Sequence, residues 1–333
     1  MHINAQEPTA LSRYLKSRQW LSEQETITGL EKPGEGNMNY TLRIITSQRS
    51  VIIKQARSYV EKYPSIPAPA ERAVIEGRFY QKVQTSQTLS GSMPALLGMD
   101  EEHNILLLED LGAASDYTFL YQPGQVLSAP EAGALVVFLS ALHSQFLTDR
   151  PDPAFTNRAM RELNHEHIFR YPFLEENGFD LDTIQPGLQA LSVPFKQNTR
   201  LREAARELGA IYLGNRSASA PLTLLHGDYY PGSWLRTKDG LKIIDPEFCF
   251  YGPAEFDLGV MLAHLKMSRQ PDDLHKAILA QYQRSDGFDE TLLNRFTGVE
   301  ILRRILGLAQ LPLSLSLEQK QDLLTDAQQL LLT

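Results

Sequence analysis

One stretch in the last third of the sequence holds the densest group of chemically useful side chains, and it opens with the tripeptide His-Gly-Asp. The aspartate is Asp228, and an apolar β-type run further on stops at Asp245, two residues before Glu247. We expect Pro246 to keep the chain extended, so that both carboxylates point to one side. Phosphoryl transfer needs a group that orients the attacking hydroxyl and oxygen ligands for Mg²⁺. Asp228 fits the first role. The two later carboxylates and the Ser233 hydroxyl fit the second.

Each fragment of this stretch also has an ordinary structural explanation. His-Gly-Asp is a common turn sequence, and an aspartate that closes a strand is most often a solvated turn residue. Their order is more informative than either fragment. In kinases a catalytic aspartate, a metal-binding polar residue and a metal-binding aspartate follow one another across a hairpin.

The N-terminal part of the chain supplies groups that could hold a nucleotide. Three β-type segments over residues 26–30, 40–45 and 50–54 are joined by a glycine-containing turn and a polar turn. Gly34 and Gly36 would let backbone N–H groups approach a phosphate closely, because no Cβ intervenes. A plain hairpin turn is the alternative for this loop.

Lys54 ends an apolar strand, where an unpaired charge would be costly to bury. A kinase uses a lysine at this place to hold the α- and β-phosphates, and a solvated strand end is the alternative. The helix expected over residues 69–84 offers Glu71 and Glu76 as partners. We favour Glu76, because it lies in the middle of that helix.

Two further strands are expected over residues 93–99 and 105–108, and the second runs into Glu109-Asp-Leu111-Gly112. A strand that stops at a polar, glycine-containing connector before a helical region indicates a hinge between two lobes. An ordinary surface loop is the alternative for this acidic segment. After it the pattern turns helical, beginning with an apolar helix over residues 130–146.

The helix expected over residues 290–308 carries an arginine in an apolar stripe. Leu292, Phe296, Val299, Leu302 and Leu306 share one face on a 3.6-residue period, and Arg303 falls inside that face. A buried arginine needs an anionic or hydrogen-bonding partner. The partner is either one of the protein's own acidic residues or a bound substrate.

Taken together, these motifs resemble the aminoglycoside-phosphotransferase-like kinases, and among them the methylthioribose kinases. The resemblance rests on HGD followed by Gly232-Ser233, on IIDPEFCFYGPAEFDLG, on the strand ending Ile-Lys-Gln-Ala, on the Gly-x-Gly-Asn-x-Asn loop and on Arg303-Arg304. It covers most of the chain, from about residue 34 to 309. The family has Leu-His-Thr where this chain has Tyr229-Tyr230-Pro231. The segment of this chain between residues 263 and 303 is also shorter than the family's.

The resemblance implies an α+β, two-lobed protein-kinase-like fold. Residues 1–110 would form a nucleotide-binding lobe with a mainly antiparallel sheet plus helix, and residues 111–333 a mainly helical catalytic and acceptor-binding lobe. The expected cofactors are ATP and Mg²⁺. Nucleotide contacts are expected from the following residues: Gly34, Gly36, Asn37, Lys54, Glu76, Glu109 and Leu111. Acceptor contacts are expected from these: Tyr229, Tyr230, Arg303 and Arg304.

Composition and charge narrow the class of protein. At 333 residues, 42% hydrophobic and 22% charged, the chain has the composition of a globular protein with room for two cores. A net charge of −8 argues against a nucleic-acid or anionic-membrane partner. One cysteine and no apolar leader predict a reducing, cytoplasmic location. A homodimer is left open.

The expected reaction is transfer of the ATP γ-phosphate to a hydroxyl of a sugar-like acceptor, with methylthioribose as first candidate. Two guanidinium groups beside the acceptor would repel a polycationic aminoglycoside by about 4 kcal/mol per close charge pair at an effective dielectric near 20. The alternatives are an aminoglycoside-, choline- or homoserine-type phosphotransferase, a catalytically silent nucleotide-binding protein, and a metal-dependent hydrolase. A hydrolase would have no use for the upstream glycine loop and lysine.

Overall fold

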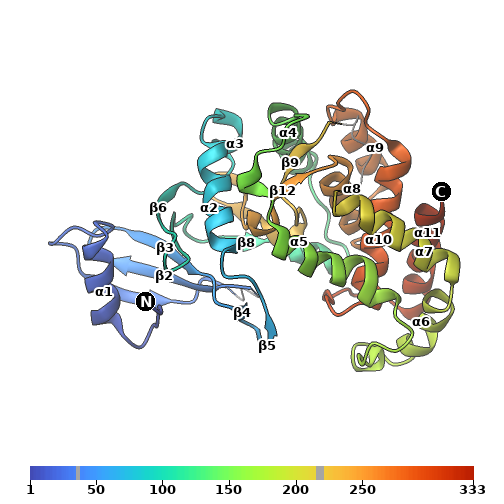
Figure 1. Ribbon diagram of the computed structural model, residues 1–333, viewed down its shortest axis with the longest axis horizontal. Coiled ribbons are helices and arrows are strands. Elements are labelled where there is room, and N and C mark those ends of the chain that lie inside the picture. Colours follow the sequence, from blue (N-terminus) through green and yellow to red (C-terminus); the bar gives the residue numbers. More distant parts are fainter. Residues whose placement is uncertain (35–37, 215–220) are drawn as a thin grey trace. The chain divides into compact units, whose positions relative to one another are not determined.

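The computed structural model describes residues 1–34, 38–214 and 221–333, which group into two compact units (Figure 1). Unit 1 comprises residues 1–114 and 237–248, and unit 2 comprises residues 115–236 and 249–333. The sequence-based division had a single boundary after residue 110. Because residues 237–248 return to unit 1, Asp245 and Glu247 belong to the same unit as Lys54.

Unit 1 is built on a five-stranded sheet in the order β1-β2-β3-β7-β6, in which all neighbouring strands are antiparallel. Its strands are β1 (Ile27–Glu31), β2 (Tyr40–Thr46), β3 (Ser50–Gln55), β6 (Leu96–Asp100) and β7 (Ile105–Glu109). The other elements are α1 (Pro8–Ser17), the hairpin β4 (Tyr59–Val60) and β5 (Tyr63–Pro67), α2 (Arg72–Val83), α3 (Gln87–Gly91), β11 (Gly240–Ile243) and the 3₁₀ turn η7 (Pro246–Phe248).

Strand alternation decides which face of this sheet each side chain meets. Val51 and Ile53 of β3 point to the face that packs against Leu11 and Leu15 of α1. Lys54 therefore points to the opposite face. That face is covered by α2, which lies so close to the sheet that a Cβ on Gly77 would come within 2.9 Å of Leu106. Lys54 is thus directed toward the helix that carries Glu76.

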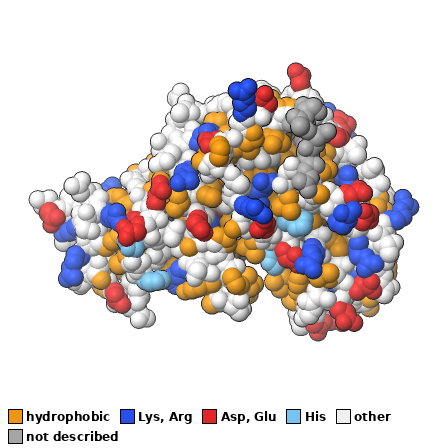
Figure 2. Space-filling model, in the orientation of Figure 1, with side chains coloured by type: hydrophobic (Ala, Val, Ile, Leu, Met, Phe, Trp, Pro, Cys, Tyr) orange, Lys and Arg blue, Asp and Glu red, His pale blue; other side chains and the backbone are white. Residues whose placement is uncertain are grey.

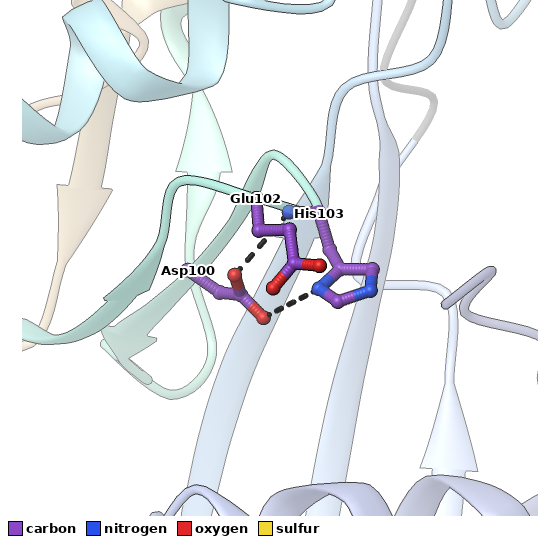
Figure 3. Close-up of side chains that lie close together, drawn as sticks. All are labelled: Asp100, Glu102 and His103. Atoms are coloured by element: carbon purple, nitrogen blue, oxygen red, sulfur yellow. Dashed lines mark hydrogen bonds and ion pairs between the residues drawn. The ribbon is translucent and has the colours of Figure 1, made fainter.

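A group of potential metal ligands in unit 1, Asp100, Glu102 and His103, serves a structural purpose (Figure 3). Asp100 is buried, accepts a hydrogen bond from the Tyr14 hydroxyl at 2.6 Å and lies 2.5 Å from the Arg18 guanidinium. Nδ1 of His103 lies 2.9 Å from the same carboxylate. The charge of Asp100 is therefore already balanced by Arg18, and the group ties α1 to the end of β6.

Unit 2 is mainly helical. Its long helices are α4 (Ala129–Gln145), α5 (Arg158–His165), α6 (Leu188–Lys196), α7 (Thr199–Tyr212), α8 (Glu255–Met267), α9 (Asp272–Gln281), α10 (Glu290–Leu306) and α11 (Leu317–Leu332). Its strands are β8 (Ser115–Asp116), β9 (Thr223–Leu225), β10 (Trp234–Thr237) and β12 (Phe250–Gly252). Short turns of helix are η1 (Tyr117–Tyr121), η2 (Pro153–Phe155), η3 (Glu166–Arg170), η4 (Tyr171–Phe173), η5 (Leu181–Thr183) and η6 (Pro231–Ser233).

The core of unit 2 surrounds α10. Nearly every side chain of this helix from Leu292 to Leu306 is buried, not only those of the predicted stripe. Close packing explains this, because a Cβ on Gly259 of α8 would lie 2.8 Å from Phe296, and one on Gly298 would lie 2.5 Å from the Ala327 carbonyl of α11. The helices α6 and α11, which the sequence-based reading did not include, complete the packing.

The predicted α+β fold is confirmed, with an antiparallel sheet in the N-terminal part and helices after it. Within the described ranges, no helix combines the length and apolar composition needed to cross a bilayer. On the face that Figure 2 shows, basic and acidic side chains are interspersed.

Candidate active site

Lys54 is the centre of a buried ion-pair cluster in unit 1. Its Nζ lies 2.8 Å from Oε2 of Glu76 and 2.6 Å from Oδ1 of Asp245. The side chains of Lys54 and Glu76 are 5% and 0% exposed. Burial by itself lowers the pKa of Lys54, but Asp245, Glu76 and Glu247 together raise it well above its ordinary value. The lysine is therefore cationic, and its pairing with Glu76 agrees with the partner favoured from the sequence.

Asp245 follows β11 in a backbone conformation that few residues adopt. Its φ is 63°, in the left-handed region, and η7 begins at the next residue. The expectation that Pro246 keeps the chain extended is therefore wrong, because the chain turns at Asp245 into a 3₁₀ turn. The Asp245 side chain remains 47% exposed although one oxygen contacts Lys54.

Glu247 is held by two residues that sequence reasoning missed. Nδ2 of Asn39 donates to its Oε2 at 2.8 Å, and Nε of Arg72 lies 3.3 Å from the same oxygen. Burial raises the pKa of Glu247, whereas Lys54 and Arg72 lower it. Arg72 also donates to the carbonyl oxygens of Met38 and Pro69. One buried arginine thus ties the end of the glycine loop to the second carboxylate of the Asp-x-Glu motif.

The remaining nucleotide-contact predictions lie at two loops. Gly34 is exposed in a bend, whereas Gly36 and Asn37 fall outside the described residues. At the expected hinge, the carboxylate of Glu109 accepts the Ala95 N–H at 3.0 Å, and Leu111 is half-buried. Arg43 binds both Asp110 and the Gly112 carbonyl, which fixes this connector to β2.

In unit 2 the loop that carries Asp228 is anchored through its backbone. Pairing of β9 with β12 sets its start, and the buried carboxylate of Asp257 on α8 then accepts the N–H groups of His226 at 2.7 Å and Gly227 at 3.0 Å. Gly227 has a φ of 86°, which permits the sharp turn before Asp228. The side chain of Asp228 is 22% exposed. Asp257 lies in the quoted motif but had no assigned role.

Tyr229 and Ser233, which follow Asp228 in the loop, are both buried. Tyr229 is completely buried, and its hydroxyl donates to the Leu135 carbonyl at 2.9 Å. The expectation that Tyr229 contacts the acceptor is therefore wrong, because its ring has no exposed surface. Ser233 is also buried, and its hydroxyl donates to the Asp228 carbonyl at 2.8 Å. It therefore braces the loop in this conformation.

Tyr230 and the twin arginines lie beside Asp228. Nη2 of Arg304 is 3.5 Å from Oδ1 of Asp228, and its guanidinium lies 4.8 Å from the centre of the Tyr230 ring. A side chain on Gly232 would collide with Tyr230, because a Cβ there would lie 2.3 Å from the tyrosine oxygen. The glycine therefore lets the Tyr230 ring fold back over Gly232.

Glu300 is the shared partner of both arginines and was not foreseen. Its Oε1 accepts from Nε of Arg304 at 2.6 Å, and its Oε2 accepts from Nη1 of Arg303 at 3.0 Å. Burial would raise the pKa of Glu300, but the two guanidinium groups lower it far below its ordinary value. The sequence allowed either an acidic residue of the protein or a bound substrate as the partner of Arg303, and the structure contains the acidic residue, Glu300. Its spacing of three and four residues before the arginines could have revealed it.

These features define a two-part phosphotransferase of the protein-kinase-like fold, with a strand lysine paired to a helix glutamate in one part and an aspartate-bearing loop in the other. The sequence signature of the phosphotransferase enzyme family matches residues 29–293, and the chain belongs to that family.

The chain is similar to methylthioribose kinases of several bacteria. The protein of Bacillus velezensis is 28% identical over 83% of this chain and 77% of its own length. That of Geobacillus kaustophilus is 27% identical over 95% of this chain and 87% of its own length. Choline kinase LicA from Streptococcus pneumoniae has the same fold, with a TM-score of 0.54, 14% identity and coverage of 97% and 99%. Spectinomycin phosphotransferase APH(9)-Ia, in complex with ADP and spectinomycin, has a TM-score of 0.53, 14% identity and coverage of 99% and 98%.

Proposed function

We propose that the protein transfers the γ-phosphate of ATP to a hydroxyl of a small sugar-like acceptor, with methylthioribose as first candidate. The observation that carries the proposal is the contact of Arg304 with Asp228, which sets a planar donor group beside the carboxylate that would orient the hydroxyl. The methylthioribose kinases to which the chain is similar support the choice of acceptor.

The nucleotide would be held in unit 1. Lys54 is a buried cation whose charge suits the α- and β-phosphates, and the Gly34 and Gly36 backbone would approach the same groups. The backbone around Glu109 and Leu111 would meet the adenine.

The carboxylates of Asp245 and Glu247 form an oxygen donor set that suits Mg²⁺, and the exposed part of Asp245 leaves room for an ion. Bound Mg²⁺ would neutralise charge on the phosphate oxygens. Ser233 would join these ligands only by releasing the Asp228 carbonyl.

The acceptor would meet unit 2 at Asp228, Tyr230 and Arg304. Forked donors suit vicinal hydroxyls, and the Tyr230 ring offers an apolar face. Repulsion of a polycation is weaker than two bare guanidinium groups would produce, because Glu300 is bound to both arginines. We further propose that the reaction takes place in the cytoplasm. A single cysteine cannot form an internal disulfide, and this suits a reducing compartment.

A panel of acceptors tests the proposal. ATP and Mg²⁺ are supplied with methylthioribose, ribose, choline, homoserine or kanamycin, and ADP release is coupled to detection of the phosphorylated product by mass spectrometry. We expect a sugar to turn over fastest. Turnover of choline or kanamycin with no sugar product would refute the acceptor class.

The Asp228→Asn variant tests the role of the loop with the preferred acceptor. We expect kcat to fall by roughly 10²- to 10⁴-fold, because general-base and orientation effects have that size, while ATP affinity persists. Asp239→Asn, a change at an exposed turn, is the control. Loss of ATP binding together with retained kcat would remove Asp228 from its assigned role.

A further inference from the structure

A buried chain of hydrogen bonds in unit 2 leads from a tyrosine hydroxyl to the twin arginines. The hydroxyl of Tyr121, at the end of η1, lies 2.6 Å from Nδ1 of His264 on α8. The other ring nitrogen, Nε2, lies 3.1 Å from Oε1 of Glu300 on α10. All three side chains are buried, at 3%, 0% and 1% exposure.

The partners of His264 fix its tautomer. A carboxylate can only accept, so Nε2 carries the proton and donates to Glu300, and Nδ1 accepts from the Tyr121 hydroxyl. Burial lowers the pKa of His264 to about 4, with the nearby Arg304 acting in the same direction. At neutral pH the ring is therefore uncharged and bonded at both ends.

An ion pair between Arg304 and Asp228 extends this row of hydrogen bonds to the loop. Glu300 uses one oxygen for Nε of Arg304 and the other for Nη1 of Arg303. Arg304 in turn reaches Asp228 with Nη2 at 3.5 Å, while the Tyr230 ring covers its face. The position of the guanidinium beside Asp228 thus depends on Glu300, whose own position depends on His264.

We propose that Tyr121, His264 and Glu300 are positioning residues for phosphoryl transfer, which hold the Arg304 guanidinium in place at Asp228. This proposal rests on the proposed function. Buried polar chains are a costly way to stabilise a core, because apolar side chains of similar volume would pack there as well or better. The residue that this chain orients is the one in contact with Asp228. Displacement of a substrate-positioning group by about 1 Å can reduce a rate by about 100-fold.

The test begins with Tyr121→Phe, which removes one hydroxyl and leaves the ring packing intact. With ATP and the best acceptor of the panel, kcat is expected to fall about tenfold or more, because His264 loses the hydrogen bond at Nδ1 that helps to orient its ring toward Glu300. The KM for ATP and the affinity for ADP are expected to stay at the wild-type values, since both depend on unit 1.

Tyr117→Phe is the matched control. It removes a buried hydroxyl that donates to a carboxylate, Glu131, at 2.8 Å in the same unit. We expect wild-type kcat for this variant. Equal kcat in the Tyr121→Phe, Tyr117→Phe and wild-type enzymes overturns the positioning role.

Two variants of His264 separate positioning from packing. Gln offers an N–H for Glu300 and a carbonyl oxygen for Tyr121, whereas Phe fills similar space without either group. His264→Gln is therefore expected to retain several-fold more kcat than His264→Phe, although His264→Phe keeps an equal or higher Tm. Activity that simply follows Tm across the two variants overturns the proposal. A wild-type enzyme that releases no ADP with any acceptor overturns the proposed function instead, and the positioning role with it.

Discussion

Nζ of Lys54 lies 2.6 Å from Oδ1 of Asp245, so a single ion pair joins strand β3 to the turn that follows β11. The two residues are far apart in sequence, and Glu76 holds the lysine from the α2 side. An ammonium group held in this way is pre-organised for phosphate, because it need not move when the nucleotide binds.

Replacement of Lys54 by Met should reduce kcat/KM for ATP by about 10²- to 10³-fold, the effect typical of losing one preorganised donor. The loss leaves Glu76, Asp245 and Glu247 near one another without their shared cation. Steady-state kinetics measure the effect. Lys242→Met, which removes a lysine bonded to the Gly91 carbonyl on the same unit, is the control and should act like the wild type. Matching kinetics in the two variants would exclude Lys54 from the nucleotide site.

Two substitutions of Asp245 should share one effect and differ in another. Both Asp245→Asn and Asp245→Ala are expected to lose the Mg²⁺-dependent part of ATP binding, measured by calorimetry with and without the metal. Asparagine tolerates a φ of 63°, whereas alanine pays roughly 1 kcal/mol for the left-handed conformation. Urea denaturation without nucleotide should therefore show a larger loss of stability for alanine than for asparagine, although both variants lose the ion pair with Lys54. Unchanged metal dependence in both variants would remove Asp245 from the metal site.

Asp257→Ala should destabilise the loop that carries Asp228. The variant orphans the buried N–H groups of His226 and Gly227, at a cost of about 1 to 3 kcal/mol each. Denaturation and amide exchange at these two residues are the measurements. Asp257→Asn keeps one carbonyl acceptor and should give an intermediate result. If both amides exchange as slowly in the alanine variant as in the wild type, the anchoring role is wrong.

The stability of the protein should fall as the pH decreases from about 6.5 to about 4. In that window the unfolded state protonates His264 while the folded state does not, because burial lowers the pKa of its ring from 6.5 to about 4. The contribution is about 3 kcal/mol. Glu300, whose folded pKa is also lowered, adds a loss in the same direction below pH 4.5. The free energy of unfolding of His264→Phe should therefore depend less steeply on pH across this window than that of the wild type. Equal slopes would show that His264 titrates normally in the folded protein.

Local patterns were sufficient for most of the fold and for the order of the motifs. The position of Glu76 in the middle of the expected helix was enough to favour it over Glu71 as the partner of Lys54, and the structure contains that ion pair. Tyr229 could not be placed in this way, since its burial depends on Leu135 of α4, which is distant in sequence. The same holds for Arg72 and Glu247, which are joined only by the folded chain. The turn at Asp245 was missed because the rule for residues before proline favours extended backbone.

The only cysteine of the sequence, Cys249, is buried and follows directly after the Asp-x-Glu segment, where the chain passes from unit 1 back into unit 2. A thiol reagent can modify this side chain only when the surrounding structure opens. The labelling rate of the unaltered protein therefore reports the local opening free energy of this connection, with no introduced probe. Because Asp245 and Glu247 lie just before it, ligands that order those residues should slow the labelling, and the protein thus contains its own reporter for nucleotide binding.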